Sequence, residues 1–234
     1  PLVLESYNSP LYTIETNTLG TANILESFRN SDFAHTLIII TTDKVYKNNN
    51  SGKKYLETDP LGGKDPYSAS KAASEILIKS YMDSYFKGMQ KKVASVRAGN
   101  VIGGGDWAQN RIIPDCIRYI ENNKKIVIRN PASTRPWQHV LEPLSGYLLL
   151  GSQLNKKNIN HQAWNFGPLS NNEINVEDLV KKIISSYGRG SYTINEDKNS
   201  YPESVLLALD IKKAQNKLNW MPILNFDETI DMTV

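Results

Sequence analysis

Along the first hundred residues, segments with apolar side chains at helical spacing alternate with short, continuously apolar runs. Between Ser9 and Asn30 they recur at helical spacing, with Ser9 placed as an N-cap and Pro10 at the first helical position. The run Thr36–Thr41 is continuously apolar and β-branched, which is typical of a strand covered on both faces. We therefore expect a helix followed by a central parallel strand.

A second helix and a second strand follow after a polar loop. The pattern predicts a long helix over Pro66–Phe86, ended by Gly88, and a short strand at Val93–Val96. Strand, helix and strand in this order favour right-handed crossovers. The predicted fold class is α/β, with a Rossmann-like, doubly wound parallel sheet.

Beyond about residue 103 the predicted elements become shorter. The spacing predicts helices at 112–121 and 142–154, a helix from the cap Asn175 toward Gly188, a helical pattern from Asp227, and strands at 125–129, 163–166 and 205–209. We interpret this half as a smaller α+β lobe interleaved with the sheet. The expected domains are residues 1–105, with later returning segments, and residues 106–234.

Composition excludes several classes of protein. The 234 residues are 40% hydrophobic and 22% charged, as in an ordinary soluble globule. A net charge of +3, with lysine pairs scattered along the chain, argues against a nucleic-acid binder. No apolar run approaches the roughly 20 residues of a membrane span. The single cysteine, Cys116, forms no internal disulfide, so we expect a core position for it and a cytoplasmic protein.

Tyr67 and Lys71 lie four residues apart on a predicted helix, so their side chains share one face. A phenol has a reference pKa of about 10, and an ammonium group within about 4–6 Å lowers it. Tyr67 could then accept a hydroxyl proton, on a small-residue surface formed by Ser68 and Ser70. The alternative is an exposed helical pair without chemistry.

Thr42, Asp43 and Lys44 follow directly after the first predicted strand. In open α/β sheets the ligand crevice lies outside the carboxyl ends of the strands, which would place these side chains beside a bound substrate. The alternative is a strand-terminating turn in which the aspartate caps the backbone and the lysine is solvated.

These features together resemble the extended short-chain dehydrogenase/reductase family. The resemblance rests on order and placement: Thr-Asp-Lys at 42–44, Tyr-x-x-x-Lys at 67–71 and Arg-Ala-Gly-Asn at 97–100. Further strings at 99–107, 111–115 and 135–140 are similar to those of nucleotide-sugar 4,6-dehydratases. Lysine at position 44, where better-known members have glutamate, resembles the branch that acts on CDP-glucose.

The resemblance implies NAD as cofactor and a role for each matching residue. The implied catalytic residues are Thr42, Asp43, Lys44, Tyr67 and Lys71. The implied cofactor contacts are Asn17, Thr41, Tyr67, Lys71, Ala98 and Val101. The implied substrate contacts are Asn100, Gly105, Trp107, Arg111, Arg135 and Tyr201, with Arg135 on the pyrophosphate. Arg111 could equally be a surface residue at a helix start, and Tyr201 stands where the family more often has histidine.

In the implied reaction, NAD⁺ takes a hydride from sugar C4 while Tyr67 accepts the hydroxyl proton and Thr42 hydrogen-bonds that oxygen. Water then leaves across C5 and C6 with Asp43 as the acid, and the hydride returns to C6. Lys44 has two open roles. It removes the C5 proton as a neutral amine, or it stays charged and stabilises the enolate.

The chain begins at Pro1 without a methionine and carries no glycine-rich dinucleotide-binding turn, so we interpret it as a piece of a longer protein. On its own, this stretch of chain should bind NAD poorly and be inactive. The alternatives to a CDP-glucose dehydratase are another nucleotide-sugar dehydratase, a 4-epimerase, or an inactive nucleotide-sugar-binding fragment. The three histidines show no ligand spacing, so no metal is expected. The resemblance also implies a homodimer that pairs through its long helices.

Overall fold

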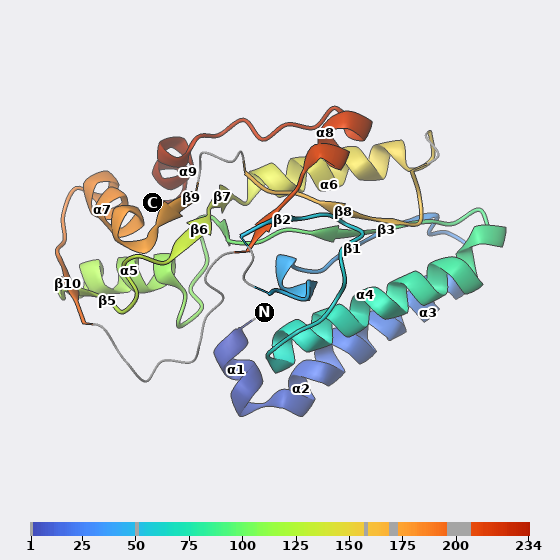
Figure 1. Ribbon diagram of the computed structural model, residues 1–234, viewed down its shortest axis with the longest axis horizontal. Helices are drawn as coiled ribbons and strands as arrows, with labels where there is room; N and C mark the ends of the chain where they lie inside the picture. Colours follow the sequence, from blue (N-terminus) through green and yellow to red (C-terminus); the bar gives the residue numbers. More distant parts are fainter. Residues whose placement is uncertain (1, 50–51, 157–158, 169–172, 196–206) are drawn as a thin grey trace.

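A three-stranded parallel sheet lies at the centre of the molecule (Figure 1). The computed structural model describes residues 2–49, 52–156, 159–168, 173–195 and 207–234. The sheet has the order β1 (Thr36–Ile40), β3 (Lys92–Arg97) and β8 (Gln162–Asn165), and both pairings are parallel. Helices α3 (Gly20–Asn30) and α4 (Pro66–Ser84) cover one face, whereas α6 (Leu141–Gln153) and α8 (Lys212–Leu218) cover the other. The predicted doubly wound α/β class is confirmed.

The expectation of a central β1 is wrong for the described residues. β3 is the middle strand, and Val93–Arg97 along it are buried. β1 lies at the edge, and its residues are only partly covered, with Ile40 53% exposed. The apolar composition of a strand indicates that both of its faces are covered. It does not indicate whether another strand pairs with each of its edges.

The N-terminal helix is interrupted. It consists of α1 (Val3–Asn8), α2 (Pro10–Ile14), a π-helical segment at Glu15–Leu19, and α3. Pro10 occupies the first turn of α2 as predicted. The π-helical segment has a local cause, since the Asn17 carbonyl accepts hydrogen bonds from Thr21 Oγ1 at 2.6 Å and Ser74 Oγ at 2.9 Å.

The smaller lobe packs around its own core. Helices α5 (Ile112–Glu121), α7 (Val176–Tyr187) and α9 (Phe226–Thr233) enclose it with the parallel pair β5 (Ile126–Ile128) and β10 (Tyr192–Ile194). Cys116 is fully buried there, which confirms the prediction of a core position. The Asn175 cap and the left-handed Gly188 also bound α7 as predicted.

Short strand pairs complete the described structure. β4 (Val101–Ile102) pairs in parallel with β7 (Gln138–His139), β2 (Lys54–Tyr55) in parallel with β11 (Ala208–Leu209), and β6 (Thr134–Pro136) antiparallel with β9 (Glu173–Asn175). Short 3₁₀ turns occupy Asp43–Val45 and Phe86–Gly88. The β4–β7 and β2–β11 pairs connect residues on both sides of position 105, and the domain boundary there stays a prediction. Within the described ranges, no helix is both long and apolar enough to cross a membrane.

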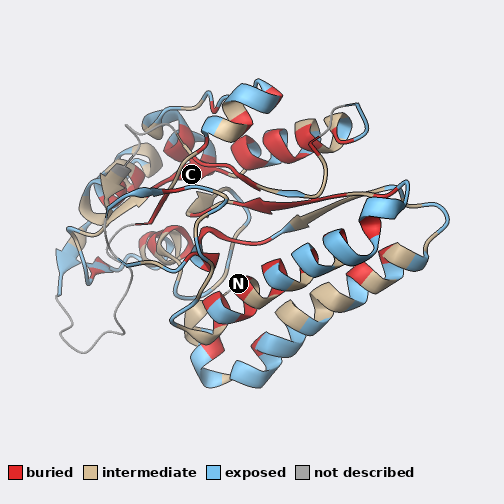
Figure 2. Ribbon diagram, turned by 45° about the vertical axis from the view of Figure 1, so that its right-hand side comes forward, coloured by how far each residue is buried: buried red, intermediate tan, exposed pale blue. Residues whose placement is uncertain are grey.

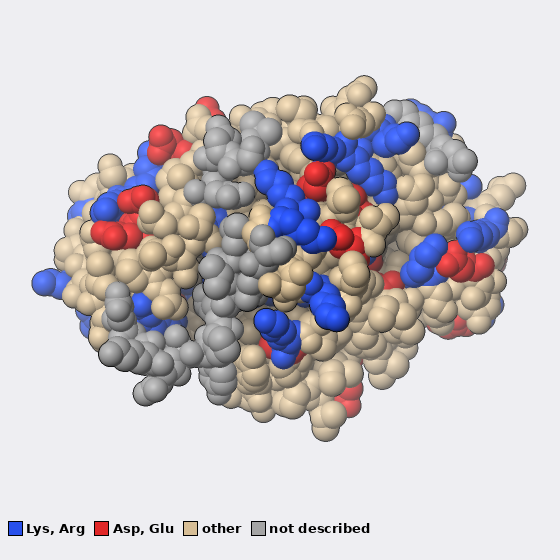
Figure 3. Space-filling model, viewed as in Figure 1, with Lys and Arg blue, Asp and Glu red and all other residues tan. Residues whose placement is uncertain are grey.

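Basic and acidic side chains are mixed on the face shown in Figure 3, with uncharged ones between them. Figure 2 shows that the outer faces of α3 and α4 are largely exposed, whereas the helix faces toward the sheet are buried. Three of the four tryptophans, Trp137, Trp164 and Trp220, are at most 6% exposed and belong to the core.

The core on the β8 side of the sheet depends on a glycine. The Phe166 ring makes edge-on contacts with Tyr147 at 5.2 Å and with Trp220 at 5.0 Å between ring centroids. A Cβ on Gly146 of α6 would overlap the Phe166 ring. The absence of a side chain therefore lets α6 approach these aromatic rings closely.

We predict that Gly146→Ala lowers the free energy of unfolding by about 1–3 kcal/mol, because the added methyl group forces the aromatic cluster apart. Urea denaturation followed by tryptophan fluorescence measures the change. Gly88→Ala is the matched control, because no atom lies within 4 Å of the position that its added methyl group would take. Equal stability of the two variants would contradict the packing argument.

Candidate active site

The carboxyl ends of β1 and β3 lie next to each other and present polar residues at one edge of the sheet. The Thr41 amide donates to the Val96 carbonyl at 2.8 Å, and the Asp43 amide donates to the Ala98 carbonyl at 3.1 Å. The chain then turns through the 3₁₀ segment Asp43–Val45, where Thr42 Oγ1 accepts from the Lys44 amide. The Thr-Asp-Lys string is thereby attached to the end of the neighbouring strand.

Asp43 is a buried carboxyl group, only 4% exposed. Thr42 Oγ1 donates to its Oδ1 at 2.9 Å. Burial raises the pKa of Asp43, and this effect outweighs the opposing charge of Lys44, the Thr42 hydrogen bond and the charge of Arg135. A carboxyl group with a raised pKa is suited to donate a proton.

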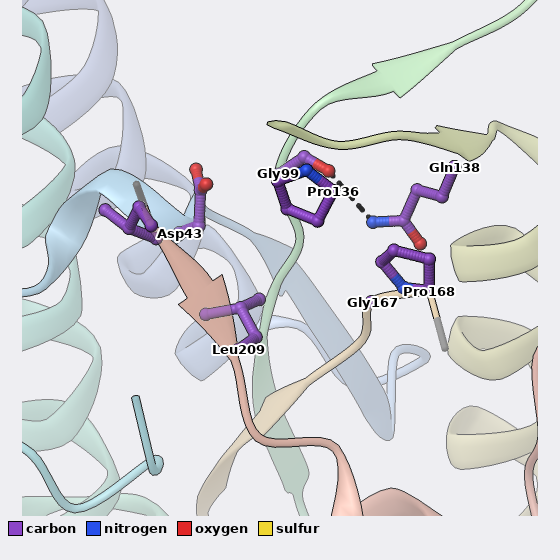
Figure 4. A pocket seen from close by; sticks show the side chains of 8 residues that line it. Asp43, Gly99, Pro136, Gln138, Gly167, Pro168 and Leu209 are labelled. Atoms are coloured by element: carbon purple, nitrogen blue, oxygen red, sulfur yellow. Dashed lines mark hydrogen bonds between the residues drawn. The ribbon is translucent and has the colours of Figure 1, made fainter. Parts of the chain in front are cut away.

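Gly99 makes room for this carboxyl group. A Cβ at Gly99 would overlap the Asp43 carboxylate atoms. The loop after β3 is fixed in turn by Gln138, whose Nε2 donates to the Gly99 carbonyl at 3.0 Å (Figure 4). Asp43, Gly99 and Gln138 line one small pocket together with Pro136, Gly167, Pro168, Leu207 and Leu209.

Tyr67 enters the same cluster from the first turn of α4. Asp65 caps that helix by accepting from the Ser68 amide at 2.9 Å, and Pro66 is at its first position. Tyr67 is 7% exposed, and the Thr42 side chain is near enough to lower its pKa. Thr42 therefore lies between the phenol and the Asp43 carboxyl group.

The pKa of Tyr67 is raised, contrary to the expectation from the Tyr-x-x-x-Lys spacing. Burial is the main cause and the Asp43 charge adds to it, while the Thr42 hydrogen bond and the Arg111 charge oppose them. Lys71 Nζ instead donates to the Ile40 carbonyl at 3.2 Å. Burial also lowers the pKa of Lys71, against the charge of Glu75.

Two arginines of the lobe act on these groups. Arg111 Nη1 forms an ion pair with Asp106 Oδ2 at 3.0 Å, and its charge lowers the pKa of Tyr67. Arg135 Nη1 donates to the Thr134 carbonyl at 2.9 Å, and its charge lowers the pKa of Asp43. The structure thus brings Thr42, Asp43 and Tyr67 together with positive charge from Arg111 and Arg135.

The other predicted site residues lie at varying places. Asn17 Nδ2 donates to Ser70 Oγ at 2.9 Å, and the hydroxyl group of Thr41 donates to Glu75. Asn100 has a left-handed backbone with φ of 51°, between Ala98 and Val101 at the end of β3. Lys44 is exposed, Gly105 has open space around it, and Trp107 is 64% exposed. Tyr201 lies outside the described residues.

Sequence reasoning missed the residues that support this cluster. Glu75 continues the four-residue spacing of Tyr67 and Lys71, so extending that spacing by one step would have found it. Gln138 and Gly99 carried no such signal, because their roles depend on contacts between separate segments. Across the part of the chain that the structure describes, no group of three or more His, Cys, Asp or Glu residues could hold a metal ion.

The fold and this cluster define the class of the protein. An open parallel sheet with Thr-Asp at a strand end, faced by tyrosine and lysine on the adjacent helix, is the arrangement of an extended short-chain dehydrogenase/reductase. Residues 2–233 match the family model described as GDP-mannose 4,6 dehydratase. The chain belongs to this family.

Individual relatives agree with that assignment. The chain is 41% identical over 240 residues to CDP-glucose 4,6-dehydratase of Salmonella typhimurium, covering all of this chain and 67% of that enzyme. It is 26% identical over 233 residues to dTDP-glucose 4,6-dehydratase of Streptomyces antibioticus, covering 98% of this chain and 65% of that enzyme.

A solved structure supports the fold. It is dTDP-glucose 4,6-dehydratase of Streptomyces venezuelae with NAD and TYD bound, with a TM-score of 0.82 at 21% identity over all of this chain and 69% of that one.

We predict that Gly99→Ala moves the Asp43 carboxyl group toward solvent, so that its raised pKa falls toward the ordinary value. Carboxyl ¹³C NMR titration measures this pKa directly. Gly104→Ala is the control, since the nearest atom to its added methyl group is the Thr233 carbonyl oxygen at 3.8 Å. An Asp43 titration that is the same in both variants would show that Gly99 does not constrain the carboxyl group.

Proposed function

We propose that the protein is an NAD-dependent 4,6-dehydratase that converts CDP-glucose to CDP-4-keto-6-deoxyglucose. The observation that carries the proposal is the convergence of Tyr67, Thr42 and Asp43 at the carboxyl end of the sheet. Tyr67, as the phenolate, would supply the base for oxidation at C4, and the buried carboxyl group would supply the acid for loss of water at C6. Both steps then take place on one sugar ring.

The residues at this edge of the sheet fit the nicotinamide end of NAD. Lys71 is half-buried beside the end of β1, and Asn17 is tied through Ser70 to the same helix face. Tyr67 and Lys71 would hold the nicotinamide ribose, with Asn17, Thr41, Ala98 and Val101 around the ring. When bound, NAD supplies the hydride acceptor for sugar C4 and the hydride donor for C6. The 234 residues contain no G-x-G-x-x-G spacing, so they do not account for the pyrophosphate of the cofactor.

The proton transfers follow from the positions and pKa values of the chain's own groups. Thr42 binds Asp43 and lies beside Tyr67, so its hydroxyl group can orient the sugar C4 oxygen toward the phenolate. Because burial raises the pKa of Tyr67, this residue acts as a base only in its phenolate form, which the charge of Arg111 favours. Burial keeps Asp43 protonated to a higher pH than an exposed aspartate, which is the form that can protonate the departing C6 hydroxyl group.

The lobe supplies the proposed grip on the nucleotide. Arg135 would bind the pyrophosphate, with Arg111 and Asn100 as further contacts, because a guanidinium group can bind two phosphate oxygens at once. Gly105, Trp107 and Tyr201 complete the proposed substrate contacts, with the exposed Trp107 ring available to stack on cytosine. The 41% identity to a CDP-glucose enzyme, against 26% to a dTDP-glucose enzyme, supports CDP-glucose as the substrate.

A 4-epimerase is the nearest alternative. UDP-galactose 4-epimerase has the same fold, with a TM-score of 0.80 at 20% identity, so the fold does not separate the two reactions. Epimerisation needs no acid for the loss of water. The buried, proton-donating Asp43 therefore favours the dehydratase.

Product analysis tests the proposed reaction. The protein expressed from its complete gene is incubated with NAD and with CDP-glucose, dTDP-glucose or GDP-mannose in turn. We expect a 4-keto-6-deoxy sugar, detected by its absorbance under alkaline conditions, from CDP-glucose in preference to the others. Binding of CDP-glucose without any keto sugar would instead support a non-catalytic binding protein.

Lys44 is proposed to act in the elimination step, either as a neutral base or as a charged group that stabilises the enolate. We predict that Lys44→Ala leaves oxidation at C4 measurable as NADH absorbance but blocks formation of the keto-deoxy product. Lys47→Ala, which removes another exposed lysine three residues away, is the control. Normal turnover by Lys44→Ala would remove this lysine from the mechanism.

A cytoplasmic homodimer is the proposed state of the protein. The single cysteine is free and buried, in keeping with a reducing compartment. Large apolar side chains are exposed along the N-terminal helices and α4, which supports pairing through them: Leu11, Tyr12, Leu19, Ile24 and Ile76 are each at least 55% exposed.

We predict that Ile76→Lys converts the dimer to a monomer, because it places a charge within an apolar contact. Light scattering coupled to size-exclusion chromatography measures the mass. Ile223→Lys is the control, because Ile223 is 82% exposed but lies between α8 and α9. A monomeric parent protein, or a dimeric Ile76→Lys variant, would contradict this interface.

A further inference from the structure

A buried carboxylate on α4 lies below the candidate active site. Glu75 is 4% exposed and accepts four hydrogen bonds from the two neighbouring strands or their ends. The donors are Thr41 Oγ1 at 2.5 Å, Ser95 Oγ at 2.9 Å, and Arg97 Nε and Nη2, each at 2.9 Å. One side chain of the helix therefore binds the carboxyl ends of both β1 and β3.

We propose that Glu75 is a positioning residue, which fixes the helix carrying Tyr67 and Lys71 against the turn carrying Thr42 and Asp43. Tyr67, Lys71 and Glu75 follow one another at four-residue intervals, so they lie on one face of α4. Lys71 binds the Ile40 carbonyl and Glu75 binds the Thr41 hydroxyl group. The last residue of β1 and the residue after it are thus held by the helix immediately before Thr42.

The same cluster also holds the far end of the turn. Arg97, bound to Glu75 through two nitrogens, donates from Nη1 to the Tyr46 hydroxyl group at 2.8 Å. Its guanidinium group also lies over the Tyr46 ring, 4.9 Å from the centroid. Glu75 therefore binds Thr41 directly and is connected to Tyr46 through Arg97. The residues between these two contacts include Thr42, Asp43 and Lys44.

The charge of Glu75 matters as well as its shape. Burial would raise the pKa of Glu75, but the hydrogen bonds and charge of Arg97, with the bonds from Thr41 and Ser95, lower it overall. Glu75 is therefore ionised, and its charge supports the protonated form of Lys71. The charged groups around it are Lys71 on its own helix and Arg97 on β3.

Stability alone is a weak reason for this ion pair. Replacing a buried pair by apolar side chains of similar volume is often neutral or stabilising, since desolvation of the charges offsets their attraction. The contacts of Glu75 do achieve one thing that apolar packing does not, because four directional hydrogen bonds define a single position of the helix relative to the two strand ends.

The catalytic roles of the positioned groups rest on the proposed dehydratase reaction. The test uses the protein expressed from its complete gene. Glu75→Gln keeps the size of the side chain but removes the charge. We expect kcat for CDP-glucose to fall by about 10- to 100-fold with KM within about twofold, since reacting groups are misplaced while the nucleotide grip is retained. We also expect the pKa of Lys71, measured by NMR, to fall.

Two further variants keep the test decisive. Asp83→Asn removes an exposed acid from the same helix, paired with Lys79 at 3.0 Å, and should change neither kcat nor the pKa of Lys71. The double variant Glu75→Leu with Arg97→Met should fold, as judged by its thermal unfolding, yet show the same loss of kcat. A folded double variant with normal kcat, or an unchanged Lys71 pKa in Glu75→Gln, would overturn the inference. If the parent protein produces no keto sugar, the proposed function fails while the Lys71 pKa still decides the role of Glu75.

Discussion

The contact between α4 and the carboxyl ends of β1 and β3 is the constraint on which the site depends. Tyr67 and Lys71 belong to the helix, whereas Thr42 and Asp43 belong to the chain leaving the strand. Neither segment contains a site alone. Only the packing of one on the other brings the phenol beside Thr42, and Lys71 to the last carbonyl of β1.

Burial of this contact is the main influence on the pKa values of its titratable groups. Burial is the largest influence on the pKa of Asp43 and of Tyr67, and it favours the neutral form of both. A neutral carboxyl group is ready to donate a proton, but a neutral phenol is a poor base. The positive charges of Arg111 and Arg135 reach the site from the lobe and oppose these shifts, so the lobe contributes to the electrostatics of the site as well as to its walls.

Much of the fold follows from local pattern, because α4 and α7 combine helical spacing with side-chain caps, and α5 shows the same spacing without a side-chain cap. The two-residue strands β2, β4 and β7 could not be predicted, since they exist only through pairing with distant segments, whereas β11 falls within the strand predicted at 205–209. The same division holds at the site. Tyr67, Lys71 and the Thr-Asp-Lys string are visible as spacing and placement, but the close approach of the Asp43 carboxyl group to Gly99 and the direction of the Tyr67 pKa shift arise from packing.

Oxidation at C4 and loss of water at C6 are proposed to occur on one ring held between Tyr67 and Asp43. Isotope tracing tests this central claim most directly, with CDP-glucose carrying deuterium at C4, NAD, and the protein expressed from its complete gene. We predict that NMR of the product finds deuterium in the new C6 methyl group of a 4-keto sugar. Deuterium that remains at C4 of an inverted sugar would identify an epimerase and contradict the proposed reaction.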